Sequence, residues 1–510
     1  MTAGELLPPD DMTLAAAGEA LASRLPVRGG DVRPTRRSYY DTFDGLLYAA
    51  GRSLVHEDGH LELVERDSGA VLCRAAADRP AKPLFARELE PGPLRDTLAD
   101  LAGARALLAL VELRGRERRF DVLDDERKTV VRLALAEPAV NGHTHLRARL
   151  RITPVRGYDK ELARVRATLE ADLGFIAADQ PLVDEAVRAT GAVPGGVSPK
   201  VELALRGEQR ADAAAVAVLR RLLEVMEANL EGAIADLDSE FLHDFRVSLR
   251  RSRSVQRELR RVFPPEPLQH FRAEFRWLQQ VTGDSRDLDV YVLEFGDFRE
   301  LVPEAMRSDL DPLLGVLEAR RRDARLKMEK ALRSERAVSL LGEWRSLLDG
   351  LEALDSAERP TAAQPIAEMA GARIRKVYRR MRKMGAEIGP DSPAEAYHEL
   401  RKKGKELRYL LELFGAPLYP GEVVRPMIKT LKALQDVLGR HQDREVQRAT
   451  LHALAAEVAR RRDGTGAVMA MGALVGRLAE DEQAARLQFA ERFAAFAAKD
   501  QRRLVRDTFA

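Results

Sequence analysis

The sequence predicts a multidomain α+β protein, in which an antiparallel β-rich part precedes an all-helical part. From Arg37 to Ile152, short segments such as SLVHEDG, HLELVER, TVVRLALA and HLRARLRI alternate in polarity and are separated by Gly, Pro and Asp-Gly. This pattern is typical of antiparallel β structure. Beyond Glu208 nearly the whole chain has helical periodicity, and several helices reach about 20 residues or more. Antiparallel bundles are the usual way to bury the apolar faces of such helices.

The order of these segments predicts the domain boundaries. Two segments of the β-rich part have helical periodicity, one near 94–110 and one at about 158–173, and GAVPGGVSPK has the composition of a linker. At 510 residues the chain is too long for one ordinary domain. We expect an N-terminal extension over 1–36, a β-rich domain over 37–190, a linker over 191–207 and a helical domain over 208–505, with halves of about 208–355 and 362–505.

Composition narrows the classes of function. The 83 basic and 81 acidic residues nearly cancel, so the net charge of +2 says little about partners. The single cysteine, Cys73, excludes an intramolecular disulfide framework and Cys-rich metal sites, and it suits a reducing compartment. The sequence has no apolar run of about 18 residues and no basic start followed by an apolar run. We therefore expect a cytoplasmic protein without a signal peptide or a membrane partner.

The helical part carries the same basic stripe twice, about 155 residues apart. Counting from each histidine, cations recur at offsets 3, 7 and 10, which fall within an arc of about 80° on one face of an α-helix. Like charges at such spacings repel by about 0.2–0.5 kcal/mol per pair, so the repeated arrangement suggests an anionic partner. The first basic stripe is His243, Arg246, Arg250 and Arg253, and the second is His398, Arg401, Lys405 and Arg408.

The duplication extends beyond these two helices. WLQQVTGDSRDLDV aligns with ALQDVLGRHQDREV, which matches Arg276 with Lys432 and Asp287 with Asp443. Duplicated halves commonly pack about a pseudo-two-fold axis, so we expect both basic stripes to face one shared cleft. The alternative is that each stripe is a solvated helix face, where exposed ion pairs contribute only about 0–1 kcal/mol.

The duplicated pattern His-x-x-Arg-x-x-x-Arg/Lys-x-x-Arg, each copy followed by L-x-x-x-x-G-x-x-x-D, resembles the CHAD domain, the conserved histidine α-helical domain, over roughly 208–500. The resemblance implies two pseudo-symmetric four-helix bundles around a basic groove. It also implies binding of inorganic polyphosphate, association with polyphosphate granules and no enzymatic activity in this domain. The implied ligands are both basic stripes with Arg257, Arg276 and Lys432.

A third basic stripe, Arg373, Lys376, Arg380 and Lys383, has the same offsets and lies just before the His398 helix. The segment 371–383 that contains it has seven basic residues and no acidic one. We predict that this stripe forms a wall of the groove, and a solvated face is the alternative.

For the two histidines, hydrogen bonding between helices is the alternative to phosphate binding. The basic residues of 320–330 point all around their helix, which favours a solvated surface.

Within the β-rich part, SYYDTFDGLLYAAGRSL and ELRGRERRFDVLDDERKTVVRLALAEPAV resemble the CYTH or triphosphate-tunnel fold, over about 37–175. Catalytic members begin with an E-x-E-x-K strand whose carboxylates hold a metal ion, and we find no such strand. Where the family expects alternating glutamates, HLRARLRI has Arg147, Arg149 and Arg151. Metal-assisted phosphoryl transfer requires clustered carboxylates. We therefore expect a degenerate CYTH-like domain, no metal, no cofactor and no enzymatic activity.

The sequence thus favours a polyphosphate-binding protein over two alternatives. One alternative is a CYTH-type metal-dependent triphosphatase whose CHAD region recruits substrate, and the missing acidic strand argues against it. The other is nucleic-acid binding. Single-strand binders interleave aromatic residues with cations so that bases can stack, whereas aromatics are only 5% here and those near the stripes are chiefly Tyr378 and Tyr409. The oligomeric state, the preferred chain length and the affinity do not follow from the sequence.

Overall fold

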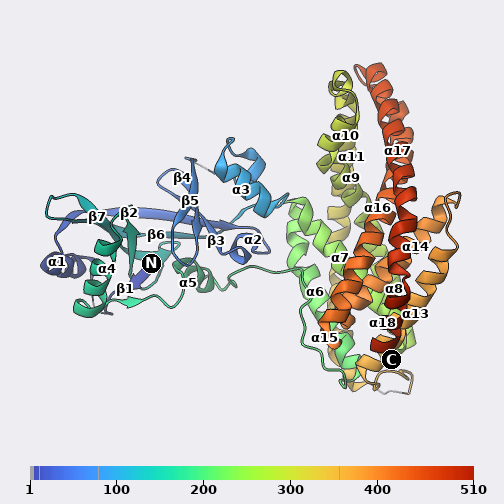
Figure 1. The fold of residues 1–510 in the computed structure, drawn as a ribbon, viewed down its shortest axis with the longest axis horizontal. Helices are drawn as coiled ribbons and strands as arrows, with labels where there is room; N and C mark the ends of the chain where they lie inside the picture. Colours follow the sequence, from blue (N-terminus) through green and yellow to red (C-terminus); the bar gives the residue numbers. More distant parts are fainter. Residues whose placement is uncertain (1–4, 11, 79, 355–356, 510) are drawn as a thin grey trace. The chain divides into compact units, whose positions relative to one another are not determined.

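The computed structural model describes residues 5–10, 12–78, 80–354 and 357–509. The chain divides into two compact units, Met1–Pro199 and Lys200–Ala510, and the division falls inside the segment 191–207. The first unit is an antiparallel β-sheet with small helices, and the second is helical (Figure 1). This order confirms the predicted α+β class.

The described part of the first unit forms one antiparallel sheet in the order β10-β1-β9-β7-β6-β2-β3-β4-β5, with β8 paired to β7. Its centre is the long pair β2 and β6, which are hydrogen-bonded along most of their length. The strands are β1 (Glu5–Leu7), β2 (Val27–Asp41), β3 (Arg52–Glu57), β4 (His60–Glu65), β5 (Val71–Ala76), β6 (Leu108–Leu123), β7 (Thr129–Val140), β8 (Thr144–His145), β9 (Arg149–Pro154) and β10 (Ile176–Ala177). The helices are α1 (Leu14–Arg24), α2 (Leu46–Ala49), α3 (Pro93–Ala102), α4 (Asp159–Ala167) and α5 (Leu182–Ala189).

The N-terminal residues belong to this sheet rather than to an extension of it. β1 pairs with both β9 and β10, and the first ten residues of β2 lie before Arg37. Leu14 and Leu21 of α1 are buried in one core with Leu162 of α4 and the apolar residues of β7. The structure therefore corrects the prediction of an extension over 1–36 for the described residues. Residues 1–4 and 11 of that range, like residue 355 at the end of the first predicted half, lie outside them.

The second unit consists of helices that range from 3 residues in α15 to 38 residues in α16. They are α6 (Ala211–Ala235), α7 (Ser239–Glu258), α8 (Pro265–Val281), α9 (Gly283–Leu293), α10 (Phe295–Leu301), α11 (Asp311–Leu332), α12 (Glu335–Gly350), α13 (Ile366–Ala386), α14 (Ala394–Leu410), α15 (Ala416–Leu418), α16 (Gly421–Val458), α17 (Gly464–Phe496) and α18 (Lys499–Thr508). A π-helical turn, Leu411–Gly415, joins α14 to α15. The main pairs are α6 with α7, α9 with α11, α13 with α14, α14 with α16, and α16 with α17.

Helices of both sequence halves share one core at one end of this unit. There α9, α10 and α11 lie beside the adjoining parts of α16 and α17 (Figure 1). Phe298 and Leu313 from the first half are buried in the same cluster as Leu451 and Leu474 from the second. The two repeats are thus joined by apolar contacts across the duplication.

Candidate functional site

The helix of the first basic stripe, α7, begins at a side-chain cap and packs closely on α6. The Asp238 carboxylate accepts hydrogen bonds from the amides of Glu240 and Phe241 at 2.8 and 3.2 Å, which satisfies donors that a helix start leaves open. Phe241 and the other apolar residues of its face are buried. Gly232 of α6 permits this approach, because a Cβ at that position would lie 2.2 Å from the Phe241 ring.

The helix of the second basic stripe, α14, is packed in the same way. Tyr397, Leu400 and Leu407 form its buried face. Gly404 lets it approach α13 and α16, because a Cβ there would lie 3.3 Å from Met381 and 3.2 Å from Gln435. In both helices the buried apolar face fixes the direction in which the basic stripe points.

Cations of the two stripes meet where α7 and α14 lie together. Burial and the neighbouring charges of Arg401 and Arg250 lower the pKa of Lys405 to about 8. Burial and the charge of Arg250 likewise lower the pKa of Arg246 to about 10. Arg250 of the first half therefore lies close enough to act on Lys405 of the second. Among the described residues, neither Arg250 nor Lys405 has an ion pair, and the Arg250 Nε is buried without a hydrogen-bond partner.

Contacts between α7 and the end of α14 hold the two stripes side by side. The Arg251 guanidinium lies 3.0 Å from the Glu412 carboxylate, and the Arg257 guanidinium lies 3.3 Å from Glu406. The guanidinium carbons of Arg251 and Arg408 lie 5.9 and 5.6 Å from the centre of the Tyr409 ring, a distance at which cation–π attraction operates. These contacts join the halves without pairing Arg250 or Lys405 with a carboxylate of the described residues.

The end of the first stripe continues onto α8. The Arg253 Nη1 donates to the Gln279 Oε1 at 3.1 Å. Burial lowers the pKa of Arg253, and the charges of Arg276, Arg257 and Arg272 lower it further. The structure thus brings together three predicted ligands and adds Arg272, which the sequence analysis missed. The spacing in the sequence could have identified Arg272, because it lies four residues before Arg276 on the same helix face.

The aspartates of the repeated Gly-x-x-x-Asp segments face the stripes. Arg401 donates to Asp443 at 3.1 Å. Arg246 instead donates to the Gln279 carbonyl at 2.9 Å and to the Thr282 hydroxyl at 2.7 Å. Burial raises the pKa of Asp287, which the charge of Arg246 partly offsets. The repeated aspartates therefore balance only part of the positive charge.

Each histidine is held by a residue that the sequence analysis did not single out. The His243 Nδ1 lies 3.0 Å from the Arg286 guanidinium, and the His398 Nδ1 lies 2.5 Å from the Gln442 Oε1. Arg286 and Gln442 occupy matching positions, each directly before the repeated aspartate. Hydrogen bonding between helices, the alternative reading of both histidines, is thus present at the Nδ1 atoms.

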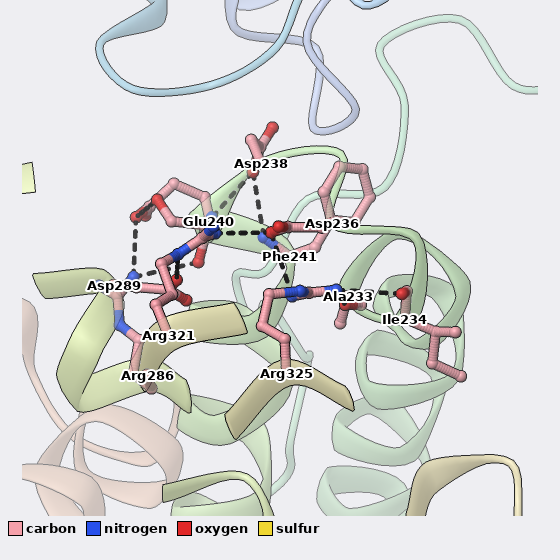
Figure 2. A network of polar contacts seen from close by, with 11 residues as sticks. Ala233, Ile234, Asp236, Asp238, Glu240, Phe241, Arg286, Asp289, Arg321 and Arg325 are labelled. Atoms are coloured by element: carbon pink, nitrogen blue, oxygen red, sulfur yellow. Dashed lines mark hydrogen bonds and ion pairs between the residues drawn. The ribbon is translucent and has the colours of Figure 1, made fainter. Parts of the chain in front are cut away.

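A polar network around Arg286 ties α11 to the turn between α6 and α7 (Figure 2). Arg321 lies 2.5 Å from Asp289 and 2.8 Å from Asp236, which ends α6 in a left-handed conformation. Arg325 donates to the carbonyls of residues 233 and 234, both at 3.0 Å. The interpretation of 320–330 as a solvated surface is therefore wrong for Arg321 and Arg325. Helical spacing shows where residues point, but it does not show which element they meet.

The third basic stripe is only partly joined to the others. Arg373 forms an ion pair with Glu258 at the end of α7. The other members, Lys376, Arg380 and Lys383, are exposed and make no hydrogen bond or ion pair with the other predicted ligands in the described part of the chain. The same holds for Lys432 on α16. Lys376, Arg380 and Lys383 therefore stay predicted ligands on α13, which packs on α14, and Lys432 stays a predicted ligand on α16.

The β unit has a cavity of about 340 Å³ lined by charges of both signs. Within it Arg37 lies 2.7 Å from Glu57, and Arg151 lies 3.8 Å from the same carboxylate. Beside the cavity, Arg149 lies 3.0 Å from Glu5. The arginines of β9 are therefore paired with carboxylates. Across the described residues, no three His, Cys, Asp or Glu side chains are grouped in a way that could hold a metal ion.

In the described parts of the chain, no helix combines the length and the apolar character needed to cross a membrane.

Comparison with known proteins agrees with this architecture. Residues 217–452 match the family model described as the CHAD domain. The crystal structure of the CHAD domain from the plant Ricinus communis superimposes with a TM-score of 0.50 and 26% identity, covering 58% of this chain and 96% of that one. The uncharacterized proteins Rv2226 and MT2285, from two strains of Mycobacterium tuberculosis, are each 32% identical over 229 residues. That match covers 43% of this chain and 41% of each relative, so the chain spans less than half the length of these curated relatives. The helical unit of this chain contains a CHAD domain.

Proposed function

We propose that the helical unit binds inorganic polyphosphate, without cleaving it, where the two basic stripes meet. The observation that carries this proposal is the pair Arg250 and Lys405, two half-buried cations from opposite halves that lack an ion pair among the described residues. Two such charges repel each other in a place of reduced solvation, which is unfavourable unless an anion lies between them.

A linear chain of phosphates matches this arrangement better than a compact anion does. It has about one charge per phosphate, and the cations extend in a row from Arg401 and Lys405 through Arg250 to Arg253. Hydrogen bonds to charged groups contribute about 1.5–3 kcal/mol each, so a few of them suffice for tight binding. The planar guanidinium of arginine also suits bidentate contact with phosphate oxygens.

The aromatic residues argue against a nucleic-acid ligand. Tyr409 and Tyr378 are only 5% and 2% exposed, and Tyr409 is covered by arginines. Neither of these two rings therefore offers a nucleobase an exposed face on which to stack. Polyphosphate has no bases, so its binding does not require an exposed aromatic ring.

The β unit is best assigned, on this proposal, as a degenerate CYTH-like domain that does not hydrolyse triphosphates. The pairing of Arg37 and Arg151 with Glu57 supports this assignment, because a paired carboxylate is less available to a cation. On the same proposal, the whole protein lies in the cytoplasm and associates with polyphosphate granules.

A titration with long-chain polyphosphate at several salt concentrations tests the proposal. The wild-type protein should bind polyphosphate more tightly than a single-stranded oligonucleotide of matched charge, with an affinity that falls steeply as salt rises. The double substitution Arg250→Gln with Lys405→Gln should remove most of this affinity, whereas Arg322→Gln with Lys327→Gln, two exposed cations on α11, should not. Equal binding of both polymers, or equal losses in both variants, would contradict the proposal.

The enzymatic alternative has its own test. Phosphate release from tripolyphosphate that requires magnesium or manganese, and that Glu57→Gln eliminates, would revive a triphosphatase function of the β unit. The proposal expects no such release.

A further inference from the structure

A second basic surface adjoins the site where the stripes meet. A shallow groove of about 560 Å³ lies where α7 ends, beside the first turns of α8. Arg260 and Arg261, in the turn between the two helices, and Arg272 on α8 line it. The acidic lining residue in the described chain is Glu358.

None of the three arginines of this groove is paired with a carboxylate in the part of the chain that the structure describes. All three are exposed, and within the described residues none of their guanidinium groups forms a hydrogen bond or an ion pair. Arginines nearby do find partners: Arg257 lies 2.9 Å from Glu258, and Arg336 lies 2.8 Å from Glu274. Three guanidinium groups around one groove outweigh the carboxylate of Glu358 and create a local positive potential that attracts anions.

The groove is continuous with the meeting point of the stripes. Arg272 and Arg276 lie four residues apart on α8 and share one helix face. Both are close enough to Arg253 for their charges to lower its pKa, after burial. A row of cations therefore leads from Lys405 and Arg250, through Arg253, to the groove.

We propose that the groove lined by Arg260, Arg261 and Arg272 is an outer subsite for the same polyphosphate chain, so that the protein selects long chains over short ones. This inference rests on the proposed function. A short chain occupies the meeting point of the stripes and ends there. A long chain leaves past Arg253 and reaches the groove, where it gains further contacts with guanidinium groups. The aromatic residue of the groove, Phe263, is only 1% exposed, so the groove offers no ring for a nucleobase.

A chain-length comparison tests the inference. The variant Arg260→Gln with Arg261→Gln and Arg272→Gln is titrated with tripolyphosphate and with long-chain polyphosphate at several salt concentrations. The control is Arg322→Gln with Lys327→Gln and Lys330→Gln, which removes the same charge from exposed positions on α11. Each lost phosphate contact lowers the salt slope by about 0.7, so the groove variant should lose a slope of about 2 for the long chain, with an affinity loss of about ten-fold. Its affinity for tripolyphosphate should stay at the wild-type value.

Each other outcome overturns a distinct statement. If the groove variant binds the long chain as the wild type does, the outer subsite does not exist, although the proposed function stands. Equal losses for both chain lengths, or an equal loss in the control, would show general electrostatic attraction in place of a subsite. If the wild-type protein binds no polyphosphate of any length, the proposed function itself fails. Thermal unfolding of each variant confirms that the fold is retained.

Discussion

Glu258 at the end of α7 and Glu406 on α14 are buried acids of opposite halves whose carboxyl groups lie close enough to act on each other's pKa. Burial raises the pKa of Glu406, and the bond to Glu258 raises it further. Burial acts in the same direction on Glu258. There the hydrogen bonds from Glu406 and Arg257 and the charge of Arg373 outweigh burial, and they hold the pKa of Glu258 below its ordinary range. As pH falls, Glu406 therefore takes up a proton before Glu258 does.

The raised pKa of Glu406 predicts how Glu406→Gln changes stability with pH. A carboxyl whose folded pKa lies above its unfolded value favours the folded state at low pH, and this advantage is lost as pH rises through the folded pKa. Glutamine keeps an N–H donor for Glu258 without titrating. The variant should therefore gain melting temperature relative to wild type at about pH 7.5 and gain less at about pH 5. Thermal unfolding at both pH values checks this prediction. The control is Glu318→Gln, at an exposed position of α11. A gain that is larger at low pH would contradict it.

Lys405 should increase the affinity for polyphosphate and lower the stability of the ligand-free protein. Its pKa is about 8 in the folded protein, against an ordinary value of 10.5, so the charged form disfavours folding below pH 8. Lys405→Met should raise the unfolding free energy of the ligand-free protein by about 0.5–2 kcal/mol near neutral pH, with a smaller gain above about pH 10. The same change should weaken polyphosphate binding. Urea denaturation and calorimetric titration measure the two effects, and Lys429→Met, an exposed lysine on α16, should show neither.

Binding should weaken as pH rises above 8. Because the pKa of Lys405 is about 8 without ligand, the side chain loses its charge above that pH, and a neighbouring phosphate raises its pKa again. Polyphosphate binding at about pH 9 should therefore take up protons, which calorimetry in buffers of different ionisation enthalpy detects. Lys405→Arg keeps its charge throughout this range, so its affinity should not fall between about pH 7 and about pH 9. The same fall in wild type and variant would assign the pH dependence to another group.

Arg286 should act as a positioning residue for His243. It lies 3.0 Å from the His243 Nδ1 and donates to the Ser239 carbonyl at 3.1 Å. Arg286→Leu leaves these acceptors without their donor, at a cost on the order of 1–3 kcal/mol in unfolding free energy. Arg286→Gln keeps a side-chain N–H that can donate to the His243 Nδ1, as the Arg286 guanidinium does, and should restore part of that loss. Nitrogen chemical shifts of the His243 ring should move in the leucine variant and return in the glutamine variant. Unchanged shifts in both would contradict a positioning role.

Periodicity and duplication in the sequence were enough to place the two stripes on matching helices. The phase of the two stripes on α7 and α14 follows from spacing alone, and the structure brings Arg250 and Lys405 together. Helical periodicity did not reveal which element a face meets, so the neighbours of Lys376 and Arg380 and the anchoring role of Arg321 could not be derived. Arg286 was missed because its contact with His243 joins two helices that are separate in the sequence.

In the β unit, strands β1 and β2 lack the local sequence pattern that predicts a strand. The first half of β2 is mostly exposed and contains two adjacent glycines and Pro34, so it lacks the alternation that marks a half-buried strand. Its place in the sheet depends on hydrogen bonds to β6, which no local pattern reveals. β1 has only three residues and is defined by its two neighbours.

The core that α9 and α11 share with α16 and α17 limits how far either repeat can act alone. Expressed separately, the first repeat would expose Leu313 and Phe298 to water, and the second would expose Leu451 and Leu474. Each half contains a complete basic helix, but neither half should fold alone. A substitution that unfolds one half should therefore unfold the other half as well.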